Sequence, residues 1–177
     1  HSLTTRGNSW GINVDNLAGS PSRFAMDAGT IGEEVSVFFQ SGNAGVSAPT
    51  TGVISGGTYR QVGFLPETTG VELTITGGTF QGPVRMNASN SKWNKTTSRV
   101  IITGGTFENN VVLNGAGSKA GDGKVTLAEI KGGTFLGKVQ AWAAASFDSS
   151  FSTPEVVISG GDFGKEFWLR PKFPLVN

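Results

Sequence analysis

The sequence predicts an all-β fold, a parallel β-helix (β-solenoid) of about six coils with a period of about 27 residues. Three observations support this prediction. Glycine accounts for 27 of the 177 residues, about twice the usual share of about 7%. Many of these glycines belong to a repeated Ile-Ser/Thr-Gly-Gly-Thr-Phe motif. β-Branched residues cluster before each Gly-Gly pair, and no long stretch has helical periodicity.

The repeat motif occurs five times, and a weaker copy precedes these at 27–31. The five copies are 53–59, 73–80, 101–107, 129–135 and 157–163. The second glycines, the weaker copy included, are Gly29, Gly57, Gly78, Gly105, Gly133 and Gly161, separated by 28, 21, 27, 28 and 28 residues. This period is too short for a propeller blade of about 40 residues, and the sequence lacks the asparagine ladder of a leucine-rich repeat. The spacing therefore favours a parallel solenoid.

An apolar residue follows each copy, and we expect it to begin a second short strand. These residues are Val35, Val62, Val84, Val111, Val139 and Phe167. The segments alternate between apolar and polar residues, as in Val84-Arg85-Met86, which is typical of a half-buried strand. Each coil should therefore contain one strand before the glycine pair and another after it.

Equivalent residues of neighbouring coils should lie directly above one another, about 4.8 Å apart. We expect an internal aromatic column of Tyr59, Phe80, Phe107, Phe135 and Phe163. We expect an internal aliphatic column of Ile54, Ile75, Ile102, Ile130 and Ile158. The glycine pairs should mark a corner where side chains do not fit and where positive φ is required.

The chain length fits one domain, residues 1–177, with coils at 10–169 and a C-terminal cap or tail at 170–177. The open end of a solenoid exposes unpaired backbone and core residues, so it must be covered. The aromatic-rich stretch 163–177, which includes this tail, is our candidate cover, because its prolines prevent further strand pairing. In this interpretation Trp168 and Phe173 either close the core or pack around a threefold axis.

The composition excludes several kinds of function. The net charge of +1 provides no electrostatic basis for binding nucleic acid. The chain has no cysteine, and its single histidine is His1, so we expect no metal site, no cofactor and no thiol or histidine catalysis. No run of about 18 apolar residues occurs, so we expect no membrane insertion.

The repeated Gly-Gly-Thr-Phe coils resemble right-handed parallel β-helices of the pectin-lyase-like superfamily, over residues of about 10–169. The segment Trp10-Gly11-Ile12-Asn13-Val14-Asp15-Asn16 resembles coils of phage tailspikes and tail fibres, and similar repeats occur in bacterial surface adhesins. The resemblance implies a right-handed coil, a homotrimer and a location on a virion or cell surface. It carries no catalytic signature, since a fold does not settle a function.

Length variation is confined to the segments between coils, at 40–52, 66–70, 87–99, 114–124 and 142–155. We expect these loops to share one edge, where solenoids often bind their partners. The proposed glycan-binding residues are Lys92, Trp93, Asn94, Lys95, Trp142 and Asp148. Indole rings stack on the C–H faces of sugars, while amides and charges bond to hydroxyls. Alternatively, these aromatic residues cover the side of the helix or pack on a neighbouring subunit.

Two other functions remain open. A polysaccharide depolymerase would use paired carboxylates, and the candidate catalytic residues are Asp122, Asp148 and Glu108. However, no equivalent position is acidic in successive coils, so the sequence does not favour an enzyme. The second alternative is a rigid adhesin spacer that has only protein partners.

Overall fold

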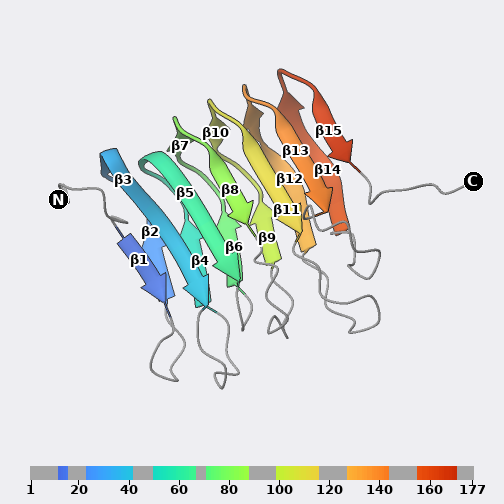
Figure 1. Ribbon diagram of the computed structural model, residues 1–177. Helices are drawn as coiled ribbons and strands as arrows, with labels where there is room; N and C mark the ends of the chain where they lie inside the picture. The colour runs from blue at the N-terminus through green and yellow to red at the C-terminus, as the bar shows by residue number, and fades with distance from the viewer. Residues whose placement is uncertain are drawn as a thin grey trace, which may run out of the picture.

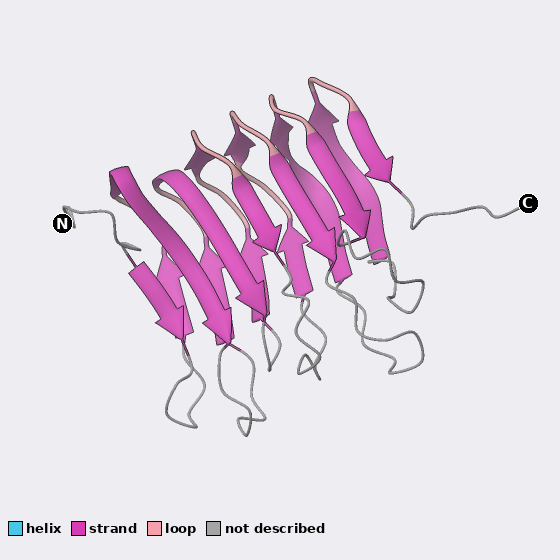
Figure 2. Ribbon diagram, in the orientation of Figure 1, coloured by secondary structure: helices cyan, strands magenta, loops and turns pink. Residues whose placement is uncertain are grey.

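The computed structural model describes residues 12–15, 23–41, 50–66, 71–87, 99–115, 127–143 and 155–170. These residues form fifteen strands joined in one sheet, and they include no helix (Figures 1 and 2). Every pairing between the strands is parallel. The predicted all-β fold with a parallel, solenoid-like sheet is therefore confirmed. Nothing in the described part of the chain forms a helix that could cross a bilayer.

The strands form two facing layers, which run in opposite directions in Figure 1. One layer contains β2 (Arg23–Met26), β4 (Thr50–Ile54), β6 (Val71–Ile75), β9 (Arg99–Ile102) and the first parts of β12 (Leu127–Phe135) and β14 (Glu155–Phe163). The other contains β1 (Ile12–Asp15), β3 (Thr30–Ser41), β5 (Thr58–Pro66), β8 (Val84–Asn87), β11 (Val111–Gly115), β13 (Val139–Ala143) and β15 (Phe167–Arg170). The two-residue strands β7 (Thr79–Phe80) and β10 (Thr106–Phe107) link the layers.

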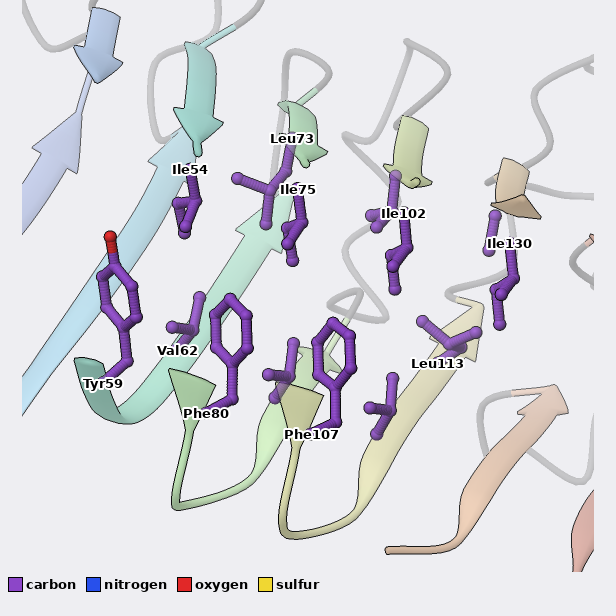
Figure 3. Packing of buried hydrophobic residues seen from close by; sticks show 14 of the residues in the cluster. Ile54, Tyr59, Val62, Leu73, Ile75, Phe80, Ile102, Phe107, Leu113 and Ile130 are labelled. Atoms are coloured by element: carbon purple, nitrogen blue, oxygen red, sulfur yellow. The ribbon is translucent and has the colours of Figure 1, made fainter. Parts of the chain in front are cut away.

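The core lies between the layers and is built from columns of identical or similar residues. Each isoleucine of the motif pairs with the isoleucine of the next copy, from Ile54 to Ile158. Val62, Val84 and Val111 form a column on the other layer, and Figure 3 shows the first of them, Val62, among the packed core residues. All of these residues except Ile158 are at most 1% exposed. The repeat is therefore a consequence of stacking, because each column requires a residue of similar size and polarity in every copy.

The predicted aromatic column is confirmed. The centroids of Tyr59 and Phe80 are 5.1 Å apart, and the next three steps, down to Phe163, measure 4.6, 4.7 and 4.8 Å. The rings are nearly parallel because the strand spacing sets their separation. The Tyr59 hydroxyl donates to the Gly56 carbonyl at 2.8 Å. Burial, followed by the nearby Asp27 carboxylate, raises the pKa of Tyr59.

Both glycines of each pair are required at the corner, for different reasons. A Cβ on Gly104 would lie 2.3 Å from the Thr76 carbonyl oxygen of the preceding repeat. Gly105 has a φ of 104°, in the left-handed region that disfavours other residues. Equivalent positive values occur at Gly29, Gly57, Gly78, Gly133 and Gly161. Since Gly29 shares this conformation, the weaker copy at 27–31 is a true member of the series.

Two strand starts differ from the sequence prediction, because β3 begins at Thr30 and β5 at Thr58, so neither Val35 nor Val62 begins a strand. Val37, and not Val35, pairs with Val62 and is fully buried. The register shifts between Ile31 and Ser36, because the chain between these two residues is longer than the equivalent turn of the next repeat. The sequence prediction counted residues from the glycine, and this count fails where the turn has a different length.

Candidate functional site

The ends of neighbouring strands that flank the inserted segments lie in register. They form one edge of the sheet, which we call the loop edge. At this edge Ser41 of β3 pairs with Pro66 of β5, and Gly115 of β11 pairs with Ala143 of β13. Thr50, at the start of β4, likewise pairs with Val71. The described residues that flank the inserted segments therefore gather at this edge (Figure 1), as the sequence predicts.

The predicted binding residues mostly fall on the inserted segments. Lys92, Trp93, Asn94, Lys95 and Asp148 lie outside the described residues, and so does the candidate catalytic residue Asp122. Trp142 lies in β13, where its backbone pairs with Asn114 and Arg170, next to the last residue of the strand. The glycan site at the loop edge stays a prediction.

Glu108, the third candidate catalytic residue, is exposed on the turn that follows β10. Its amide donates to the Phe80 carbonyl at 2.9 Å. This turn precedes β11, so it lies at the end of β11 that is opposite to the loop edge. The structure therefore places Glu108 away from the edge at which the inserted segments begin and end.

Glu129, on the outer face of the first layer, forms ion pairs with both Arg99 and Lys131. Its carboxylate lies 2.5 Å from Arg99 Nη2 and 2.5 Å from Lys131 Nζ. Hydrogen bonds from Lys131, and then from Arg99, lower the pKa of Glu129. A carboxylate that is ionised and held by two cations is unsuited to donate a proton as a general acid.

Trp168 lies on the outer face of the second layer and is 49% exposed. Its indole Nε1–H donates to Glu166 Oε2 at 2.8 Å. Lys138 Nζ lies 4.9 Å from the ring centroid and 3.9 Å from Glu166 Oε2. The half-buried Gln140 pairs with Trp168 in the neighbouring strand. An exposed ring, two charges and an amide thus lie together on one surface.

Trp168 does not close the core, which is one of the two roles that the sequence suggests for it, because its side chain lies on the outer face. Phe167 occupies the inward position, because it pairs with Val139 and its ring contacts Phe163 edge-on at 6.4 Å. Strand alternation then directs Trp168 outward. The alternation visible in the equivalent segments, such as Val139-Gln140, was the sequence signal that could have placed Trp168 on the surface.

A shallow, open groove of about 650 Å³ runs over the glycine corners. Its lining consists of the second glycine of each of the five pairs, the first glycine of three of them, and Thr79, Thr106, Thr134 and Asp162. The groove follows from the absence of side chains at the corners. Within the described ranges, no group of three or more histidine, aspartate or glutamate residues is arranged to hold a metal ion.

Comparison with protein-family models, curated proteins and solved structures finds no match to this chain. The class of protein is therefore defined by the fold alone, as an all-β repeat protein with a parallel, solenoid-like sheet. The resemblance to parallel β-helices rests on the repeat and on this sheet.

Proposed function

We propose that this chain is a structural and receptor-binding segment of a virion fibre, a tailspike or a cell-surface protein, and that its loop edge binds a glycan. The observation that carries the proposal is the register of the strand ends. Described residues on both sides of the inserted segments lie at one edge, next to one another. Insertions at a single edge leave the stack intact and gather polar and aromatic residues into one surface.

The proposed architecture is a right-handed parallel β-helix of about six coils, forming one domain with residues 170–177 as a cap or tail. Among the residues that the structure describes, six glycines have positive φ, one in each copy of the motif, and they support this coil number. The handedness, the homotrimer and the extracellular or virion location follow from the resemblance to tailspikes and adhesins. Measurement of the mass in solution tests the trimer.

The proposed contacts follow from the chemistry of the inserted segments. Trp93 and Trp142 would stack on the C–H faces of sugar rings. Lys92, Asn94, Lys95 and Asp148 would hydrogen-bond to the hydroxyls. This combination of an apolar ring with polar neighbours is typical of saccharide-binding surfaces, which require both contact area and orientation.

A glycan array tests the proposal. The wild-type chain should bind a subset of glycans, and the double variant Trp93→Ala/Trp142→Ala should lose this binding while its thermal unfolding stays unchanged. Glu108→Gln is a matched control at the opposite end of β11. If the folded wild-type chain binds no glycan at high concentration, the glycan-binding proposal is wrong and the rigid spacer is the function that fits. Release of reducing ends from a bound polysaccharide would instead indicate the depolymerase, with Asp122 and Asp148 as the first residues to replace.

A further inference from the structure

We infer that Trp168 forms a second sugar-stacking position, outside the loop edge, for a saccharide ring without net charge. This inference rests on the proposed function, because it assigns the same class of ligand to another surface. The position consists of Trp168, Lys138, Glu166 and Gln140, which we call the Trp168 platform. It lies on the outer face of β13 and β15 and on the turns that precede them.

The indole is held in place before a ligand arrives. Its Nε1–H donates to Glu166 Oε2 at 2.8 Å, and the Lys138 ammonium lies over the ring at 4.9 Å from the centroid. The main chain at Lys138 is fixed as well, because its backbone amide donates to Asn110 Oδ1 at 3.0 Å, and its ammonium is paired with Glu166 at 3.9 Å. A ring fixed in this way loses little conformational entropy on binding, which favours stacking.

Lys138 lies over one face of the indole. Lys138 belongs to the turn before β13, so it approaches the ring from the side of the preceding repeat. β15 is the last strand in the order of the sheet and pairs only with β13 among the described residues (Figure 1). No described strand therefore covers the outer side of Trp168, and half of its surface remains exposed.

The charges of the platform favour an uncharged ligand. Lys138 Nζ and Glu166 Oε2 are 3.9 Å apart and compensate each other. The nearest register neighbour is the neutral Gln140, whose amide can both donate and accept hydrogen bonds. A neutral sugar stacked on the face opposite Lys138 presents an apolar ring face to the indole and hydroxyls to the exposed Glu166 carboxylate. A polyanion would instead meet the Glu166 carboxylate, whose side chain is 71% exposed.

The test is a titration of the whole chain with laminarin and dextran as uncharged probes and polygalacturonate as the acidic probe. Wild-type protein should bind an uncharged probe with an affinity that does not fall as salt is raised. Trp168→Ala should weaken this binding roughly tenfold or more. Leu136→Ala is the matched control, because Leu136 is a similarly exposed apolar residue at 48% on the turn before β13. It should leave the affinity unchanged.

The outcomes separate this inference from the proposed function. Binding that survives Trp168→Ala but is lost in Trp93→Ala/Trp142→Ala overturns the platform and leaves the loop edge. Loss of sugar binding in Trp168→Ala, with binding retained in Trp93→Ala/Trp142→Ala, supports the platform and overturns the loop edge as the binding site. A preference for polygalacturonate that weakens with salt overturns the neutral ligand class. A fall in solution mass on Trp168→Ala, with sugar binding unchanged, overturns the inference by making this residue a contact between copies.

Discussion

The middle of the stack and its carboxyl-terminal end contain equivalent residues in different surroundings. Ile102 and Ile130 are 1% and 0% exposed, whereas Ile158, which pairs with Ile130 in the same column, is 40% exposed. The difference arises because β12 has a paired strand on both sides, while β14 pairs only with β12 among the described residues. The motif alone thus does not bury a residue. Burial requires a neighbouring repeat on each side.

The aromatic column shows the same contrast. Phe107 has stacked rings on both sides, at 4.6 and 4.7 Å. Phe163 has one stacked ring, Phe135 at 4.8 Å, and an edge contact with Phe167. Phe107 is fully buried and Phe163 is only half-buried. The same side chain should therefore contribute more to stability in the middle of the stack than at its end.

Substitution of the two phenylalanines should give the largest difference. Phe107→Ala should lower the free energy of unfolding by about 3–5 kcal/mol, because the lost ring leaves a cavity between two others. Phe163→Ala should cost about half as much or less, since solvent can fill the space. Denaturant unfolding of both variants measures the contrast. Equal losses would mean that Phe163 is covered in solution, by a partner or by another part of the chain.

The glycines should show a smaller contrast. Gly104→Ala would place a Cβ 2.3 Å from the Thr76 carbonyl oxygen, so the backbone of two repeats must shift, at about 1–3 kcal/mol. Gly164 follows Phe163 and is not a corner glycine, and its Cβ in Gly164→Ala would lie 3.3 Å from the nearest atom, the Phe135 carbonyl oxygen. Gly164→Ala should therefore cost less than Gly104→Ala, because its neighbour has to move by only a few tenths of an ångström. Thermal unfolding of the pair checks this, and a neutral Gly104→Ala would show that the corner can relax.

The columns were predictable from the sequence because stacking imposes a residue of similar size and polarity at the same place in every repeat. The isoleucines and phenylalanines of the motif therefore appear in the printed sequence in the order in which they stack. Positions that no column fixes were harder to predict. The longer turn after Ile31 puts Val37 in the column where a fixed spacing from the glycine points to Val35, and strand alternation puts Phe167, not Trp168, in the inward position.

The candidate site was less predictable, for a physical reason. Inserted segments such as those containing Trp93 and Asp148 have no equivalent in the next repeat, so no column constrains them. The Trp168 platform depends on contacts between residues of two repeats, Lys138 with Trp168 and Glu166. The register had to be known before these residues could be brought together.

The smallest expected effect concerns Glu129 and its counterpart at the end, Val157, which pair in register. The pKa of Glu129 is lowered in the folded chain, so its ion pairs stabilise the fold above the ordinary glutamate pKa of 4.5. This stabilisation is lost as the pH falls through the lowered pKa. Glu129→Gln should lower the Tm by at most about 3 °C at neutral pH, because nearly half of each cationic side chain is exposed and solvent weakens the ion pairs.

The difference in Tm between wild type and Glu129→Gln should disappear in acid, when the carboxylate of the wild type is protonated as well. Thermal unfolding of both proteins, followed from neutral pH to below the glutamate pKa of 4.5, measures this difference in Tm. Glu108→Gln, at an exposed position, is the control variant. High salt at neutral pH should reduce the difference in the same direction, since it screens exposed charges. A difference that persists at low pH would mean that Glu129 acts through packing of its side chain against the outer face. In that case the contrast with Val157 would be one of shape, not of charge.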